Sequence, residues 1–260
     1  AEQFTERGIK VLVDTKVESV QRPGVQDTGL GWIHGGPATI TAGGSTFEVD
    51  EIVVAAGRTP VTDDLGLERI GVDVSNSDGY LTTDDHMAVV DGPNWLYAVG
   101  DVNGRALLTH MGKYQARIAG DVIAARAEGR SIDGLRHRDV ADHEIVPAVV
   151  FSQPQVASVG ISEATARERG IDVQALEYEI GSVAGASVLR DGYSGKAKLV
   201  VDRASDTLVG ATFLGPDVAE LLHAATIAIV GKVTLAALWH AVPSYPTVSE
   251  VWLRLLESRN

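Results

Sequence analysis

Two short apolar runs, each reaching a glycine near its end, constrain the fold of this chain more than any other feature. The first covers residues 51–57 (Glu-Ile-Val-Val-Ala-Ala-Gly) and the second covers residues 95–101 (Trp-Leu-Tyr-Ala-Val-Gly-Asp). A continuous apolar run of strand length is typical of a strand that is covered on both faces. The two runs therefore predict two buried strands, as in an α/β domain, and apolar residues spaced three and four apart from Leu107 to Val122 predict a helix after the second.

The segments on either side of this region have a different pattern. Short alternating segments within residues 15–49 predict a β-meander. Beyond a polar stretch at residues 131–143, strands that are neighbours in sequence alternate with a few helices, which predicts an α+β layer with its helices on one side. The expected strands are 147–151, 173–180, 195–202 and 208–214. Three helices are expected: one that begins after Ser162, one over 216–230 and one over 247–257. The charged cluster 136–139 is interpreted as a solvated linker.

The composition excludes several classes of function. The 260 residues include 22 Lys and Arg against 35 Asp and Glu, and the resulting net charge of −13 repels nucleic acids and anionic membranes. We therefore expect neither as a partner. The chain has no cysteine, so it holds no disulfide or thiol nucleophile, and its seven histidines are too scattered to predict a metal site. The first residues lack a targeting signal, which favours a cytoplasmic location.

The end of the second apolar run is the first candidate site. Gly100 would allow a ligand to approach the backbone, and the Asp101 carboxylate could accept hydrogen bonds from sugar-like hydroxyl groups. This geometry suits a nucleotide cofactor. On the pattern alone, a cap of the turn before the next helix is the favoured role of Asp101.

An ordered set of motifs extends this interpretation to nearly the whole chain. It comprises Ala55–Pro60, Leu65–Glu68, Tyr80–Thr82, Tyr97–Asp101, Leu107–His110, Pro147–Pro154, Gly210–Pro216 and Tyr245–Glu250. In this order the motifs resemble the second half of the FAD-dependent pyridine nucleotide-disulfide oxidoreductases, a family that includes lipoamide dehydrogenase and soluble transhydrogenase.

The resemblance implies FAD and NAD(P)H as cofactors. Asp101 would hold the ribityl and pyrophosphate region of FAD, and the backbone of Leu107, Leu108, Thr109 and His110 would pass the flavin ring. Gly57 and Gly100 are the remaining candidate cofactor-binding residues. The family's Gly-rich FAD loop, redox cysteine pair and Gly-rich NAD(P) loop have no counterpart in this sequence, so we expect a carboxyl-terminal fragment that retains flavin weakly and is inactive alone.

The resemblance also implies a fold and an assembly. Residues 1–50 would be the tail of the NAD(P)-binding domain with its β-meander, residues 51–140 the carboxyl-terminal part of the FAD-binding domain, and residues 141–260 an α+β dimerisation domain. The chain would thus combine an α/β remnant of the two nucleotide-binding domains with an interface domain. A homodimer is expected, with the Tyr245 end of one subunit over the flavin of the other.

The carboxyl-terminal motif departs from the disulfide reductases. Their motif reads His-Pro-Thr-x-Ser-Glu, whereas Tyr245 stands in the position of the imidazole here. A phenol with an ordinary pKa of roughly 10 is a poor base near neutral pH, which weakens the case for dithiol chemistry. Glu250 is a candidate catalytic residue, but Thr247 and Glu250 also form a capping-box pattern. His240 could be a displaced base or a packed side chain.

Three functions remain open at this point. The leading hypothesis is hydride transfer from a nicotinamide through flavin to a small acceptor, either a quinone or another nicotinamide, because the Tyr-Pro-Thr form resembles soluble transhydrogenase. The second is a non-enzymatic dimerisation module with an unused cofactor site. The third is a dihydrolipoamide dehydrogenase-type disulfide reductase whose cysteines lie upstream.

Overall fold

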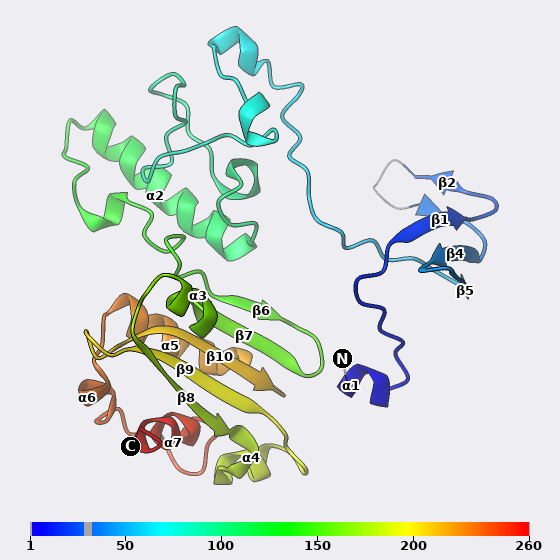
Figure 1. Ribbon diagram of the computed structural model, residues 1–260. Coiled ribbons are helices and arrows are strands. Elements are labelled where there is room, and N and C mark those ends of the chain that lie inside the picture. Colours follow the sequence, from blue (N-terminus) through cyan, green and yellow to red (C-terminus); the bar gives the residue numbers. More distant parts are fainter. Residues whose placement is uncertain (1, 29–32, 260) are drawn as a thin grey trace. The chain divides into compact units, whose positions relative to one another are not determined.

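The computed structural model describes residues 2–28 and 33–259 (Figure 1). The described residues divide into two compact units, a first unit that ends at Thr59 and a second unit that begins at Pro60. The first unit begins with the helix α1 (Glu2–Glu6) and contains an antiparallel sheet in the order β1-β4-β5. These strands cover Val17–Gln21, Ala38–Ala42 and Ser45–Val49, and a short pair joins β2 (Gln26–Asp27) to β3 (Ile33–His34). The predicted meander is therefore present.

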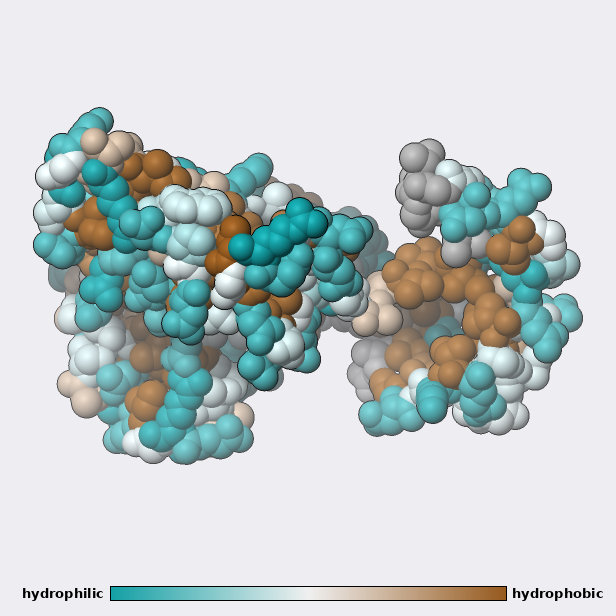
Figure 2. Space-filling view, turned by 90° about the horizontal axis from the view of Figure 1, so that it is seen from above, coloured by the Kyte–Doolittle hydropathy of each residue, from teal (hydrophilic) through white to brown (hydrophobic). Residues whose placement is uncertain are grey.

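The first predicted buried strand is wrong. Residues 51–59 carry no regular secondary structure, and Val53 and Val54 are 89% and 82% exposed. A strand buried on both faces needs neighbours that pair with its backbone and layers that cover its side chains. No strand pairs with this segment in the described part of the chain, so it remains extended and exposed. Apolar side chains are also visible on the surface of the first unit in Figure 2.

The second predicted buried strand is only partly correct. Ala98 is buried and its N–H donates to the carbonyl of Met87 at 3.1 Å, but residues 95–99 form only an isolated bridge, Ala88 with Tyr97. Trp95 is 63% exposed. The run therefore pairs with a nearby irregular segment. The predicted helix does follow, as α2 (Thr109–Ala127), which buries Ile118 and Val122. Three short 3-10 helices precede it: η1 (Leu67–Ile70), η2 (Ser75–Ser77) and η3 (Gly100–Asn103).

The segment between α2 and the last sheet corrects another expectation. It contains the 3-10 helix η4 (Leu135–His137), and Asp139 within the charged cluster is fully buried. The cluster is therefore docked against its own unit and is not a wholly solvated linker. Within residues 60–260 the structure shows a single compact unit, and the domain boundaries at 50 and 140 remain predictions.

The last part of the chain forms a five-stranded antiparallel sheet in the order β6-β7-β10-β9-β8. Four strands match the predicted positions, and β7 was not predicted because its Gln155–Gly160 sequence mixes small and polar residues. The strands cover Ala148–Val150 (β6), Gln155–Gly160 (β7), Val173–Glu179 (β8), Lys196–Asp202 (β9) and Thr207–Gly215 (β10).

Helices cover both faces of this sheet, which corrects the expectation of helices on one side (Figure 1). Alternation along β9 explains the arrangement, since Leu199 joins the main core while the next residue, Val200, packs with Ala166 of α3 (Glu163–Glu168). The main core also contains residues of α5 (Ala219–Val230) and α7 (Glu250–Glu257). The remaining short helices are η5 (Ile180–Ser182), α4 (Ala184–Leu189) and α6 (Leu235–Leu238).

Candidate functional site

The structure brings most of the predicted cofactor residues into one turn followed by a helix. Gly100 begins η3 with a φ of 77°, a conformation that favours glycine. A Cβ on Gly112 of α2 would stand 3.1 Å from the Gly100 Cα, so the turn lies directly against the helix. Asp101 follows with its side chain exposed. A ligand could therefore reach the backbone and the carboxylate of this turn together.

The amino end of α2 lies at the end of the same loop. Leu108 is the N-cap and provides no side-chain cap, and the first turn contains no acidic residue. Such a helix end presents backbone N–H groups and a partial positive charge, which favour an oxygen atom or an anion. Thr109 and His110 are exposed there, and the His110 Nε2 bonds the carbonyl oxygen of Pro147 at 2.8 Å.

A buried amide network holds the turn from behind. The Gln115 Oε1 accepts the Gly100 N–H at 2.8 Å and a hydrogen from the Asn103 Nδ2 at 3.0 Å. The same Asn103 nitrogen donates to the Ala98 carbonyl at 3.2 Å, and the Asn103 Oδ1 accepts the Arg105 N–H at 3.1 Å. Both amide residues are buried. Two side chains therefore fix both ends of the loop that carries Asp101.

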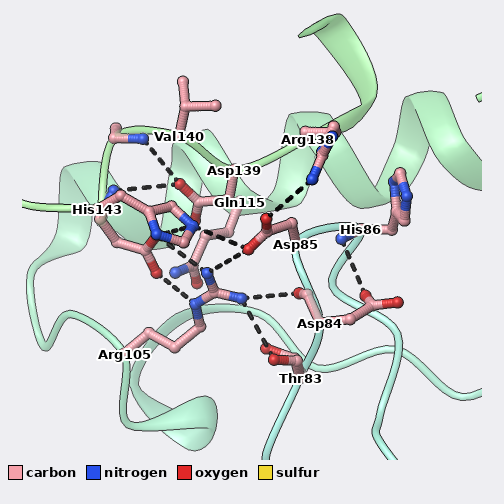
Figure 3. A network of polar contacts seen from close by, with 12 residues as sticks. Thr83, Asp84, Asp85, His86, Arg105, Gln115, Arg138, Asp139, Val140 and His143 are labelled. Carbon is pink, nitrogen blue, oxygen red and sulfur yellow. Dashed lines mark hydrogen bonds and ion pairs between the residues drawn. The ribbon is translucent and has the colours of Figure 1, made fainter. Parts of the chain in front are cut away.

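Arg105 connects this loop to the segment after η4 (Figure 3). Its Nη2 lies 3.0 Å from a carboxylate oxygen of Asp142 and 3.0 Å from one of Asp85, and its Nη1 donates to the Asp84 carbonyl at 2.7 Å. The Asp139 N–H donates to the Asp85 carbonyl at 2.8 Å. Because the guanidinium presents several donors in one plane, Arg105 can hold both carboxylates simultaneously.

The charges in this network shift one another's pKa values. Burial raises the pKa of Asp139, whose Oδ1 accepts the N–H groups of Ala141 and Asp142. Partial burial by itself would raise the pKa of Asp85. Hydrogen bonds from His143 and Arg105 outweigh it and hold the pKa of Asp85 below its ordinary value. The hydrogen bond to Asp85, 2.9 Å long, raises the pKa of His143.

Gly57, the remaining candidate cofactor residue, lies in the first unit. It is exposed, with a φ of 111° that favours glycine. Its role in binding a cofactor remains a prediction.

The three candidate catalytic residues have very different surroundings. Tyr245 is 77% exposed and His240 is also exposed. Glu250 is buried, and its Oε1 accepts the N–H of Thr247 and that of Gly185, each at 3.1 Å. The Glu250 half of the predicted capping box is therefore present. The other half is absent, because α7 has Ser249 as its N-cap with no side-chain cap bond, and the Thr247 hydroxyl donates to the carbonyl of Ser244.

Family models match almost the whole chain. The model described as pyridine nucleotide-disulphide oxidoreductase matches residues 1–129, and the model for the dimerisation domain of the same family matches residues 146–255. This chain belongs to the pyridine nucleotide-disulphide oxidoreductases. The second match places an α+β dimerisation domain of this family on the five-stranded sheet and its helices.

Individual members of the family are similar over the same length. The chain is 30% identical to a dihydrolipoyl dehydrogenase of Chlamydia muridarum over 251 residues, which are 96% of this chain and 48% of that protein. It is 34% identical to one of Mycobacterium tuberculosis over 250 residues, 95% of this chain and 49% of that protein. The chain thus spans about half the length of the curated relatives that it matches.

Solved structures show the same fold. The HOCl-induced flavoprotein disulfide reductase RclA from Escherichia coli aligns with a TM-score of 0.80 at 24% identity, covering 100% of this chain and 54% of that one. LpdA from Mycobacterium tuberculosis aligns with a TM-score of 0.78 at 23% identity, covering 98% and 50%.

Three residues that hold the Asp101 turn in place were not identified from the sequence. Gln115 occupies one of the buried positions of α2, which are otherwise apolar. A polar residue at such a position is a sequence signal for a buried hydrogen bond. Asp85 and Arg105 gave none, because they come from loops 20 residues apart whose approach depends on the tertiary fold.

Proposed function

We propose that this chain provides one side of the flavin site and the dimerisation domain of an FAD-dependent NAD(P)H oxidoreductase. The observation that carries the proposal is the exposed Asp101 carboxylate in a glycine turn beside the uncapped amino end of α2. Bound FAD would supply the chemistry, accepting a hydride from reduced nicotinamide and passing its electrons to an acceptor.

The residues of the turn fit a flavin nucleotide chemically. The Asp101 carboxylate can accept hydrogen bonds from ribityl hydroxyl groups, and the N–H groups at the start of α2 can donate to a ring oxygen. Gly100 and Gly112 lie in contact where the turn approaches α2 most closely, and neither residue has a Cβ there. Leu107 and Leu108 are half-buried beside this helix end and offer apolar contact.

The flavin contact can be tested in the whole gene product that carries this chain. Asp101→Ala should weaken FAD binding by about tenfold or more, measured by the fluorescence of released FAD during dilution, since one charge-assisted contact is lost. Asp191→Ala, an exposed aspartate in the dimerisation domain, is the matched control and should retain FAD. Equal retention in both variants would contradict the role of Asp101.

The electron acceptor is inferred from the carboxyl-terminal motif. We infer direct transfer to a quinone or a nicotinamide, because Tyr245 replaces an imidazole and is exposed where a partner subunit could contact it. The relatives named dihydrolipoyl dehydrogenase favour a second candidate, a disulfide reductase. Turnover of the whole gene product with dihydrolipoamide, compared with turnover with quinone or nicotinamide, separates the two. A dimer in solution, measured by light scattering, is expected in both cases.

Two substitutions of Glu250 can distinguish a structural role from a catalytic role. Glu250→Ala should lower the free energy of unfolding by about 2–3 kcal/mol, because the buried Gly185 N–H and the partly buried Thr247 N–H lose their acceptor. Glu250→Gln keeps an acceptor oxygen and should cost less than about 1 kcal/mol. If Glu250→Gln instead abolished turnover while stability was unchanged, Glu250 would act in catalysis.

A further inference from the structure

A cavity beside α2 is lined by several arginine side chains, although the protein as a whole is acidic. It measures about 300 Å³ and lies between α2 and the residues of η4 and its C-cap, with Arg117, Arg136 and Arg138 in its lining. Asp121 is the acidic residue of the lining. The chain as a whole carries a net charge of −13, so this concentration of positive charge is the reverse of its general character.

The three arginines differ in how far neighbouring carboxylates neutralise them. Arg136 is paired with Asp121 through two hydrogen bonds of 2.6 and 3.1 Å. Arg138 has a single long contact of 3.5 Å to Asp85. Arg117 has no carboxylate within 4.0 Å among the described residues, and its guanidinium lies 5.8 Å from the centre of the Tyr114 ring. The cavity therefore retains unneutralised positive charge, centred on Arg117.

The walls of the cavity are held in place. The Tyr114 hydroxyl accepts the Val140 N–H at 3.2 Å, and the Arg136–Asp121 pair joins η4 to α2. A site whose groups are already positioned loses less entropy when a ligand binds. At the rim, Leu135 is 80% exposed and provides an apolar surface.

We propose that this cavity binds the phosphate group of a small phosphorylated molecule. Guanidinium groups from two segments can donate to a tetrahedral oxyanion from more than one side, which a phosphate satisfies better than a planar carboxylate. The volume of about 300 Å³ lies at the lower end of the roughly 300–1,000 Å³ that small-molecule pockets span, which suits a small phosphorylated molecule. The site uses α2 side chains other than Gln115, and it is independent of the proposed flavin contact.

The test is calorimetric titration of the whole 260-residue chain with ribose 5-phosphate, with ribose as the uncharged comparison. We expect saturable binding of ribose 5-phosphate and none of ribose. Arg117→Gln should weaken binding roughly tenfold, the loss expected for one charge-assisted hydrogen bond. Arg117 is exposed on the helix surface, so this variant keeps the fold.

The matched control is Arg190→Gln, which removes the same charge from an exposed arginine outside the cavity. It should bind as tightly as the unaltered chain. The proposal is overturned if ribose 5-phosphate fails to saturate the chain at about 10 mM, where any Kd below 1 mM gives near-complete occupancy. Equal affinities in the Arg117→Gln and Arg190→Gln variants would also overturn it.

Discussion

At the scale of single residues, buried amides determine how the Asp101 turn is held. Gln115 is fully buried and supplies the acceptor for two donors, one from the Gly100 backbone and one from Asn103. No apolar residue can replace that oxygen, so the polar residue is required inside an otherwise apolar helix face. The sequence period located the helix correctly but could not show which loop Gln115 would meet.

Substitution of Gln115 by Leu should therefore be costly. We expect the free energy of unfolding to fall by about 1–3 kcal/mol, because the Gly100 N–H loses its acceptor and the Asn103 Nδ2 keeps only the Ala98 carbonyl. Urea denaturation would measure the change. Lys113→Leu, an exposed position on the same helix, is the control and should change stability by less than about 0.5 kcal/mol.

His143 should give part of the stability a pH dependence. The pKa of His143 is raised above its ordinary 6.5 in the folded chain by the Asp85 hydrogen bond, and Asp142, Arg105 and Arg138 lie around that pair. A raised pKa stabilises the fold fully below about pH 6.5 and loses this effect as the pH rises through the folded value. His143 is mostly exposed, so solvent limits the contribution to under about 1 kcal/mol.

The measurement is the stability difference between the unaltered chain and His143→Gln. It should be largest below about pH 6.5 and shrink as the pH rises through the raised pKa of the folded state. A difference that grew as the pH rose would show that the protonated imidazole does not stabilise this network.

At the scale of elements, the dimerisation domain was the more predictable part. Its strands are antiparallel and are joined mostly by short local turns or single helices, so alternation and turn residues locate them. The run at 51–57 shows the opposite case. Its apolar residues are typical of a strand whose two faces are covered by other elements. They do not show whether neighbouring strands are present to pair with it.

The helix α4 packs closely against the segment before α7. A Cβ on Gly185 would stand only 1.9 Å from the Thr247 carbonyl carbon, so Gly185→Ala must displace backbone. We expect a loss of more than about 3 kcal/mol of stability, measured by thermal or urea unfolding. Gly120→Ala in α2 is the control, since nothing lies within 4 Å of its Cβ position. It should stabilise the chain by about 0.5–1 kcal/mol.

At the scale of the whole molecule, the division between the two units lies at an exposed segment. Along the chain, the division between units 1–59 and 60–260 follows directly after residues 51–59, which have no regular secondary structure. Limited proteolysis with trypsin should cut first after Arg58 and release a stable product beginning at Thr59, because proteases act on exposed, irregular backbone. Mass spectrometry of the early products would identify the cut. First cleavage within residues 60–260 would contradict the division.

Arg105 has a consequence for assembly. It joins the loop that carries Asp101 to the segment that leads into the five-stranded sheet, so both belong to one body before any partner subunit docks. Association of two such chains would then require little rearrangement near the cofactor contact, and its entropic cost would be correspondingly low. Substitution of Arg105 should therefore make subunits pair more slowly or more weakly. This effect is expected even though Arg105 is distant in sequence from the exposed apolar residues of the last domain.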